Sequence, residues 1–348
     1  RVSRRQRQMC IRDSRRTDIN DTRQDISNED LIPEETRVLT ISRTGYAKTQ
    51  PLEEYREQRR GGQGKAAASV KEEDVIQNLY VLSSHSQMLC FTTKGKVYWL
   101  KVYEVPVASR TSKGRPLVNM LNLDDDEKVS DILPVDEFSE DRYVFMATRK
   151  GTTKKTQLSF FAKKYKSGIK AINLDADDEL IGSAITNGDD EILLASSAGK
   201  LIRFSEKKVR PMGRTARGVR GMRIKKDQQI ISLMVADNEK EILCVSENGF
   251  GKKTPVDDFP THNRGGQGVI SIKTSERNGL MVASTLVDNN DGIMLISDKG
   301  TMIRTSAEQI PTISRNTQGV KIITPKEGEK ILECVRICLL YTSDAADD

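Results

Sequence analysis

The sequence predicts an all-β fold, a six-bladed propeller with four short antiparallel strands in each blade. A pair of glycines recurs six times along the chain, at a period of about 50 residues. Short apolar runs bounded by Gly, Asp or Asn turns surround each pair, and long helical periodicity is absent. Four strands in ~40–50 residues, repeated in series, are typical of propellers, because radial repetition covers most strand edges.

The first glycine of each pair predicts a β-hairpin. It ends a turn that contains Ser or Thr, or both, and the six copies are Gly45, Gly95, Gly151, Gly199, Gly249 and Gly300. In the fourth repeat, the apolar run 192–195 leads into the turn and 201–204 forms the return strand. Tight hairpin turns need a positive φ angle, which accounts for glycine at this position.

The second glycine predicts where the third strand begins. It follows the first by 19 residues in five repeats and by 17 in the third, at Gly64, Gly114, Gly168, Gly218, Gly268 and Gly319. We expect a strand directly after it, such as 269–272, and then an acidic turn, such as 123–127. The fourth strand resembles 230–234.

The repeats set the expected domain boundaries. One closed six-bladed domain is expected over residues 34–336. Residues 15–33 are polar and acid-rich and are interpreted as a linker. Residues 1–14 and 337–348 match nothing in the repeats and are interpreted as non-native sequence at the two ends.

Composition excludes several classes of function. No apolar run approaches the ~20 residues of a membrane span. Five scattered cysteines without a CxxC pair, and two distant histidines, argue against a disulfide framework or a metal site. A P-loop would need Gly at position 59 and Ser or Thr after Lys65, whereas the sequence has Arg59 and Ala66. We expect no catalytic residue, no metal and no cofactor in this domain.

Charge is segregated in phase with the repeats. The six windows between paired glycines, with their immediate flanks, are 45–64, 95–115, 150–170, 199–223, 249–268 and 299–321. Together they hold 32 Lys and Arg against 8 Asp and Glu, a net +24, which leaves −18 for the rest of a chain whose total is +6. Equivalent positions of a closed propeller lie on one ring, so the windows predict a basic track for a polyanion. Aromatic residues are only 5% of the chain, which favours duplex DNA over stacked single strands.

Nineteen basic residues of these windows are predicted to form the rim that contacts DNA. They are Lys48, Lys96, Arg110, Lys113, Arg115, Lys154, Lys155, Lys166, Lys170, Lys200, Arg203, Arg214, Arg217, Arg220, Lys252, Lys253, Arg264, Arg304 and Arg315.

A glycine-rich basic box closes the first window. It reads Gln58-Arg59-Arg60-Gly61-Gly62-Gln63-Gly64 and is followed by Lys65. Its glycines admit a phosphate close to the backbone, and its arginines are permanently charged planar donors. A degenerate copy, Asn263-Arg264-Gly265-Gly266-Gln267-Gly268, occupies the same place in the fifth repeat. We expect residues 58–65 to bind DNA.

The box resembles the Q-R-R-G-G-K-G motif of bacterial DNA gyrase A subunits, in their C-terminal DNA-wrapping domain. Six of seven positions match, and Gln63 stands where the family has Lys. Similar stretches include 34–38, 113–116, 218–221 and 315–320, and the resemblance covers about residues 15–336.

The resemblance implies a β-pinwheel, a propeller variant whose blades exchange a strand with their neighbours, and places the box where the first and last blades meet. It implies that residues 15–33 lead from an N-terminal catalytic half. The implied partners are double-stranded DNA, that N-terminal half and the ATPase subunit, in an A2B2 complex of the bacterial cytoplasm and nucleoid. ATP and magnesium act elsewhere in that enzyme, which introduces negative supercoils.

Two alternatives remain at this point. The C-terminal domain of the DNA-cleaving polypeptide of topoisomerase IV shares the architecture but typically lacks the box and has fewer or degenerate blades. A propeller scaffold that binds acidic proteins is the alternative from a different class. A mobility shift with plasmid DNA separates this second alternative from the DNA-binding interpretation.

Overall fold

The computed structural model describes residues 31–42, 44–52, 76–109, 112–124, 126–299, 302–325 and 328–337. The chain divides into two compact units, Arg1–Pro33 and Glu34–Asp348, and all described strands lie in the second. No helix of the described residues is long and apolar enough to cross a membrane.

Each repeat begins with a hairpin of two strands. The first strands are β1 (Thr36–Ser42), β4 (Gln87–Thr92), β8 (Tyr143–Thr148), β12 (Glu191–Ser196), β16 (Glu241–Ser246) and β20 (Gly292–Ser297). The second strands are β2 (Tyr46–Pro51), β5 (Lys96–Lys101), β9 (Thr152–Gln157), β13 (Lys200–Ser205), β17 (Phe250–Pro255) and β21 (Met302–Ser306). All five described turn glycines have positive φ, from 71° to 86°, as the sequence predicts.

Within the described residues, a short 3-10 helix follows the second strand in the second to sixth repeats. These helices are η3 (Val102–Glu104), η4 (Leu158–Phe161), η5 (Glu206–Lys208), η6 (Val256–Asp258) and η7 (Ala307–Gln309). A two-residue strand comes next: β6 (Arg115–Pro116), β10 (Ile169–Lys170), β14 (Val219–Arg220), β18 (Val269–Ile270) or β22 (Val320–Lys321). In the second repeat the one-turn helix α2 (Val118–Leu121) follows β6. Each repeat ends with an inner strand: β3 (Ile76–Ser83), β7 (Val129–Val135), β11 (Leu180–Thr186), β15 (Ile230–Val235), β19 (Met281–Val287) or β23 (Ile331–Ile337).

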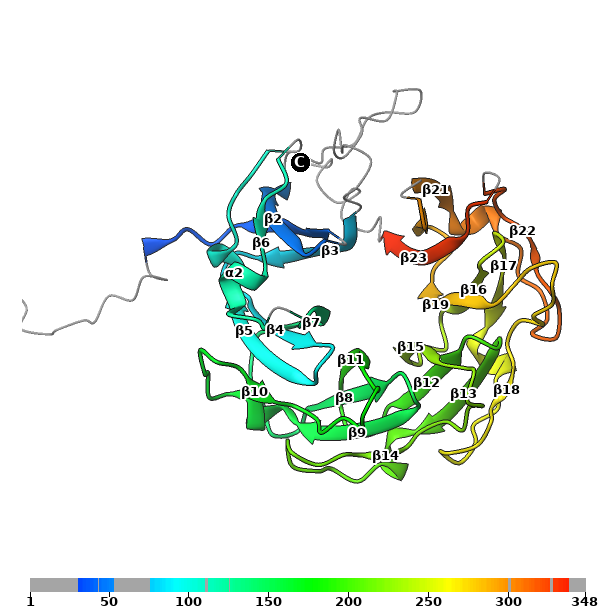
Figure 1. The fold of residues 1–348 in the computed structure, drawn as a ribbon, viewed down its shortest axis with the longest axis horizontal. Coiled ribbons are helices and arrows are strands. Elements are labelled where there is room, and N and C mark those ends of the chain that lie inside the picture. The colour runs from blue at the N-terminus through cyan, green and yellow to red at the C-terminus, as the bar shows by residue number, and fades with distance from the viewer. Residues whose placement is uncertain are drawn as a thin grey trace, which may run out of the picture. The chain divides into compact units, whose positions relative to one another are not determined.

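The two-residue strands are exchanged between blades. Five sheets have the orders β3-β1-β2-β6, β7-β4-β5-β10, β11-β8-β9-β14, β15-β12-β13-β18 and β19-β16-β17-β22. The outermost strand of each therefore comes from the next repeat along the chain. The described part of the sixth sheet is β23-β20-β21. The structure confirms the predicted six-bladed pinwheel of four-stranded antiparallel blades (Figure 1).

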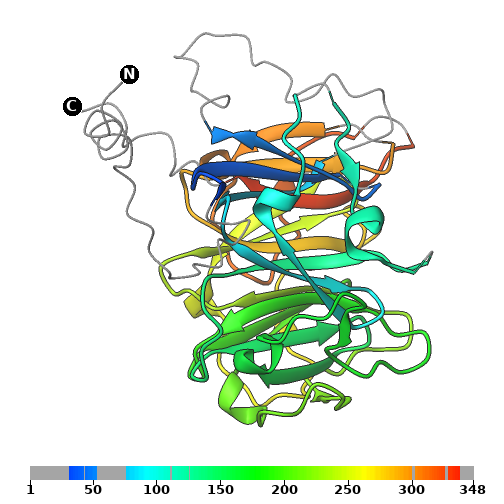
Figure 2. The same ribbon diagram turned by 90° about the vertical axis from the view of Figure 1, so that its left-hand side faces the viewer.

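The inner strands pack against one another around the centre of the unit, and the exchanged strands lie at its outer edge (Figure 1). β3 of the first blade also contacts β23 of the last. Seen from the side, the strands run across the unit and the turns project at its two edges (Figure 2). The core lies between neighbouring blades; Phe145 of β8 and Phe204 of β13, for example, are both fully buried, with their ring centroids 6.3 Å apart.

The exchanged strands are shorter than the four residues expected. After the second residue, two consecutive amides no longer pair with the neighbouring strand and instead donate to the same carbonyl group. In the fourth blade, the N–H groups of Ser271 and Ile272 donate to the carbonyl of the turn glycine Gly199, at 2.8 and 3.1 Å. The second glycine of the pair also has a packing role. A Cβ on Gly218 would lie 2.5 Å from the carbonyl oxygen of Thr153 on the preceding blade, so only glycine allows this approach.

A half-buried aspartate joins the inner strands of the second and third blades. Asp131 of β7 accepts hydrogen bonds from the amide and the hydroxyl of Ser183 on β11, at 2.6 and 3.0 Å. Burial raises the pKa of Asp131 to about 6, despite these donors.

This shift predicts a pH dependence of stability. The folded state binds the proton more tightly than the unfolded state, so the contribution of Asp131 is fully present below pH ~4 and declines as the pH rises through 6. We expect Asp131→Asn to abolish this decline. Urea unfolding at pH 4.5 and 7.5 measures it, and an equal pH response of both proteins would contradict the assignment.

Candidate nucleic-acid interface

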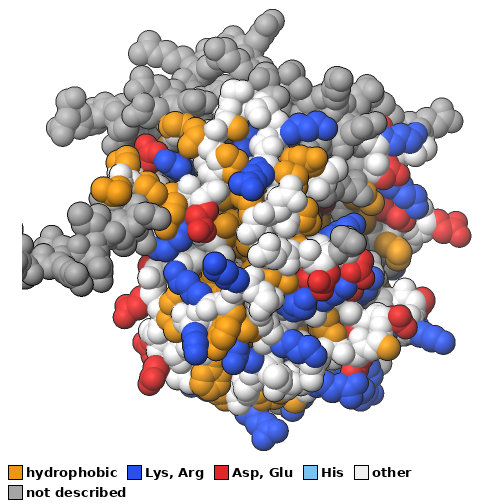
Figure 3. Space-filling view, turned by 60° about the vertical axis from the view of Figure 1, so that its left-hand side comes forward, with side chains coloured by type: hydrophobic (Ala, Val, Ile, Leu, Met, Phe, Trp, Pro, Cys, Tyr) orange, Lys and Arg blue, Asp and Glu red, His pale blue; other side chains and the backbone are white. Residues whose placement is uncertain are grey.

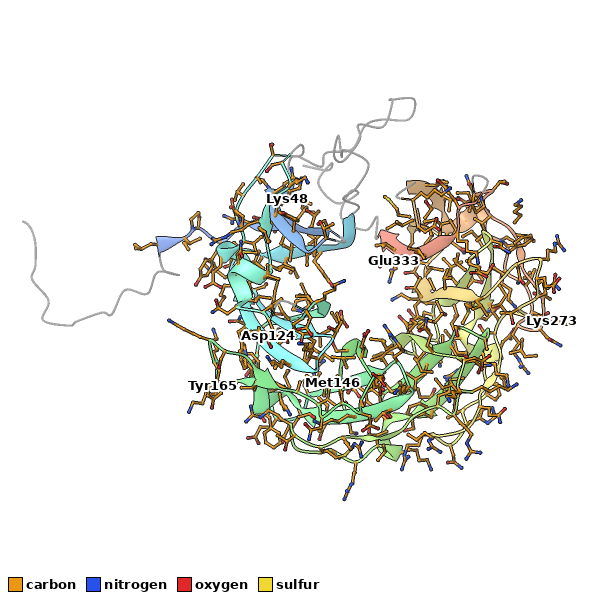
Figure 4. All side chains as sticks on the ribbon, in the orientation of Figure 1. Lys48, Asp124, Met146, Tyr165, Lys273 and Glu333 are labelled. Carbon is orange, nitrogen blue, oxygen red and sulfur yellow. The ribbon has the colours of Figure 1, made fainter. Side chains whose placement is uncertain are left out.

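Five strap segments follow the outer side of the blades. Each strap runs from the end of a 3-10 helix to the strand given to the preceding blade. The described residues of the five straps are 105–109 with 112–116, 162–170, 209–220, 259–270 and 310–321. Four of them cross the second strand of the preceding blade through a single parallel bridge, at Thr49, Lys155, Arg203 and Lys253. Tyr165, in the second strap, points outward from the edge of the unit (Figure 4).

Consecutive straps are joined by main-chain hydrogen bonds. The residue three positions after the end of an exchanged strand donates to a carbonyl of the next strap: Asn173 to Ala216, Arg223 to Gly266 and Lys273 to Thr317, at 3.2, 2.7 and 2.7 Å. From the second strap to the last, the straps therefore form one continuous belt at the outer edge of the blades.

The belt and the segments next to it carry many exposed basic side chains. On the belt, Lys166, Lys170, Arg217 and Arg220 are exposed and Arg214, Arg264 and Arg315 are half-buried; Lys113 and Arg115 are exposed on the first strap, and Lys96 and Lys200 are half-buried at the start of second strands. Figure 3 shows Lys and Arg side chains gathered over the lower half of the face that it draws. The structure therefore brings these eleven residues to one side of successive blades.

Some of these cations are shared with local carboxylates. Lys96 contacts Asp124 and Glu127, at 2.9 and 3.3 Å, and its pKa is raised, chiefly by the hydrogen bond to Asp124. Arg217 pairs with Asp175. Arg264 donates to the carbonyls of Lys208 and Arg220, which ties two neighbouring segments together. These cations can bind a DNA phosphate only if they keep their present partners at the same time or exchange them for the phosphate.

Six residues of the predicted rim lie inside the blades, so their assignment to an exposed rim is corrected. They are Lys48, Lys154, Lys155, Arg203, Lys252 and Lys253, all 8% exposed or less. Each sits in the middle of a second strand, where the neighbouring blade covers one side and the strap covers the other. Their charges are used within the fold and do not face solvent.

Three of these six form ion pairs. Lys155 lies 3.4 Å from Glu206 of η5, and Lys253 lies 2.8 Å from Glu241. Arg203 pairs with Glu191 and donates to the carbonyl of Val256 at 3.0 Å, which joins the fourth blade to the fifth.

Part of the prediction lies outside the described residues. The box, residues 58–65, and Arg110 fall there, as does the side chain of Arg304, so their role as DNA contacts stays a prediction. Further exposed cations that were not among the predicted rim residues lie beside the rim: Lys163, Lys164, Lys207, Lys208, Arg210, Arg223, Lys225, Lys226, Lys273 and Lys321. Most of them lie in the counted windows, so their position in the repeat was the signal that could have found them.

The described residues contain no cluster of three or more His, Cys, Asp or Glu side chains that could hold a metal ion. Cys90, Cys244 and Cys334 are free thiols, and burial raises the pKa of Cys90 to about 12.

The repeats match a family model described as DNA gyrase C-terminal domain, beta-propeller, over residues 36–83, 86–136, 142–187, 190–237, 240–287 and 293–337. The chain is 50% identical over 325 residues to the DNA gyrase A protein of Salmonella typhimurium, and 48% to that of Escherichia coli K12. Both alignments cover 93% of this chain and 37% of the relative, so the chain spans little more than a third of these proteins.

Two solved structures share the fold. The C-terminal domain of DNA topoisomerase IV superposes with a TM-score of 0.73 and 24% identity, over 88% of this chain and 94% of that one. A DNA gyrase A C-terminal domain gives 0.71 and 24%, over 87% and 100%. The resemblance seen in the sequence is thus confirmed, and the chain belongs to the DNA gyrase C-terminal domain family of β-propellers.

Proposed function

We propose that the chain binds duplex DNA along the strap segments and wraps it around the outer edge of the blades. The observation that supports this most strongly is the exposed basic belt, in which cations recur at equivalent positions of successive blades. A regular row of Lys and Arg follows a phosphate backbone without reading base sequence, so affinity comes from charge neutralisation and counterion release.

Wrapping needs a surface that holds DNA at several points along a curve. Smooth bending by 40–90° over 20–30 base pairs costs ~1–6 kcal/mol, which contacts on successive blades must offset. Main-chain bonds between straps keep these contacts at fixed spacing. In the intact enzyme, we propose that this wrap fixes a handed DNA crossing, so that gyrase introduces negative supercoils with ATP.

The proposed setting follows from the relatives, which are DNA gyrase A proteins. The chain would work beside the ATPase subunit of gyrase and the catalytic N-terminal half of its own polypeptide, in an A2B2 complex on the bacterial nucleoid. The domain itself contributes no catalytic residue, metal or nucleotide site to this proposal.

Relaxing a plasmid with the chain bound, and then reading its linking number, tests wrapping. We expect a shift for the wild type that largely vanishes for Arg59→Ala with Arg60→Ala, although affinity falls only modestly, because the pair is 2 of 32 window cations. The reason is that the box is the proposed last contact of the wrap. In the holoenzyme, supercoiling should be lost and relaxation kept.

The matched control is Lys207→Ala with Lys208→Ala, which removes the same charge from exposed positions outside the box. At equal DNA occupancy, the control should keep the linking-number shift. Equal shifts for the wild type and the box variant would leave the box without a special role, and the absence of a shift in the wild type would refute wrapping.

A further inference from the structure

A buried lysine recurs in alternate blades, at the third position after the turn glycine. Lys48, Lys154 and Lys252 occupy this position in the first, third and fifth blades. Lys154 and Lys252 have no exposed surface, and Lys48 is 6% exposed. The second and fourth blades have Tyr98 and Ile202 at this position.

Each of these ammonium groups binds main-chain carbonyls of a strap that crosses its blade. Lys48 donates to Ser109 and Ser112, at 3.1 and 2.9 Å. Lys252 donates to Ser314 at 2.6 Å. Lys154 donates to the carbonyl of Arg214 in the third strap, which crosses its blade, and also to that of Ala171 at 2.5 Å, just after the second strap.

The strap sequence differs where an apolar residue replaces the lysine. The straps over Lys154 and Lys252 read Gly213-Arg214-Thr215 and Ser314-Arg315-Asn316. The strap over Ile202 instead reads Asn263-Arg264-Gly265-Gly266. A Cβ on Gly266 would lie 3.5 Å from Ile202, so this strap packs on an apolar side chain where the others meet an ammonium.

Burying an ammonium is expensive unless it is well bound. Among the described residues, no carboxylate forms an ion pair with Lys154 or Lys252 within 4.0 Å, and carbonyls are the hydrogen-bond acceptors of both. A leucine or isoleucine would fill the same space without this cost, as Ile202 does in the fourth blade. Unlike an apolar residue, each lysine donates directional hydrogen bonds to the strap backbone and so fixes its position.

We propose that Lys48, Lys154 and Lys252 are positioning residues for DNA binding, each fixing the strap that presents the exposed cations of the next repeat. This inference rests on the proposed DNA-binding function. The cations held in this way include Lys113 and Arg115 on the first strap, Arg214, Arg217 and Arg220 on the third, and Arg315 and Lys321 on the last.

The hydrogen bonds from the lysine to the strap are stronger while the lysine is charged, because a charge-assisted hydrogen bond is about twice as strong as a neutral one. Burial, aided by the nearby guanidinium of Arg214, lowers the pKa of Lys154 to about 7. Burial also lowers the pKa of Lys252 to about 8, with Cys244 and Asp258 opposing and Arg315 assisting this shift. Arginine does not titrate in this range, so Arg214 and Arg315 stay charged while the lysines titrate, and comparison with a lysine variant assigns a pH-dependent change to the lysine.

The first test is Lys154→Ile, the residue that the fourth blade carries at this position. Hydrogen exchange needs no DNA, and we expect faster exchange at the amide of Met212, which bonds the third strap to Lys155, and at the amide of Ala216, which closes a turn within that strap. The amides of His262 and Ile313, in the fourth and last straps, should not change and serve as internal controls. Lys252→Ile should give the converse result, with Ile313 affected and Met212 unaffected.

The second test is the affinity of the same variants for duplex DNA between pH 5.5 and 9.5, at constant ionic strength. Near pH 5.5, where Lys154 is charged, we expect Lys154→Ile to bind roughly tenfold more weakly than the wild type, which corresponds to about one charge-assisted hydrogen bond. As the pH rises the wild type should weaken and the two should converge. Leu194→Ala, a core change in the fourth blade, should lower stability and leave the pH profile of DNA binding unchanged.

Unchanged exchange at Met212 and Ala216, together with a wild-type pH profile in Lys154→Ile, would overturn the positioning role. If the wild type failed to bind DNA, the proposed function would fall, while the exchange result would still decide whether the lysine holds the strap.

Discussion

The affinity of this chain for duplex DNA is expected to fall by about 10³–10⁵ between 50 and 200 mM salt, as for a protein that neutralises ~6–10 phosphates. The exposed cations of the belt are numerous enough for such contacts even without the six buried residues. Fluorescence anisotropy with a long mixed-sequence duplex measures the slope. A flat response would refute the basic track, and strong sequence preference would refute backbone recognition.

The same measurement locates the track. Arg217→Ala with Arg220→Ala removes two exposed cations of one strap, and each lost phosphate contact should lower the salt slope by about one. Lys128→Ala with Arg142→Ala removes two exposed cations outside the straps and should leave the slope unchanged. Equal effects of the two pairs would show that DNA follows another path.

Much of the fold could be predicted because its signals are local. The first glycine of each pair marks a turn and the second marks a close backbone approach. Both requirements are steric and favour glycine, so both positions can be recognised in the sequence. Gly199 shows the first and Gly218 the second. The exchange of the outer strand was available only through the family resemblance, because a two-residue strand such as Val219–Arg220 has no pattern of its own.

The rim was only partly predictable because burial in this fold does not follow alternation along the strand. In β9, the central residues Thr153, Lys154, Lys155 and Thr156 are all buried, since a blade covers one side and a strap covers the other. A half-buried strand would leave every second side chain in water. Basic residues of the second strands therefore looked like those of the straps in sequence, and only the chain path separates them.

Glu206→Ala is expected to lower the free energy of unfolding by about 3–5 kcal/mol, the usual cost of breaking a buried ion pair. The Glu206 carboxylate has no exposed surface. It accepts hydrogen bonds from the Thr186 hydroxyl and from the amides of Gly188 and Asp190, at 2.8, 2.8 and 2.9 Å. Its removal leaves these donors and the buried ammonium of Lys155 without their acceptor. Urea unfolding followed by circular dichroism measures the loss.

The control is Glu179→Ala, which removes the partner of Arg149 in an exposed ion pair and should cost less than about 1 kcal/mol. Replacing both partners by apolar residues, as in Lys155→Met with Glu206→Leu, should recover only part of this loss, because the buried ammonium is no longer left without its partner but the three donors around Glu206 still lack their acceptor. DNA affinity of the folded double variant should equal that of the wild type, since Lys155 lies inside the blade. A loss of affinity with unchanged stability would instead return Lys155 to the DNA-binding rim.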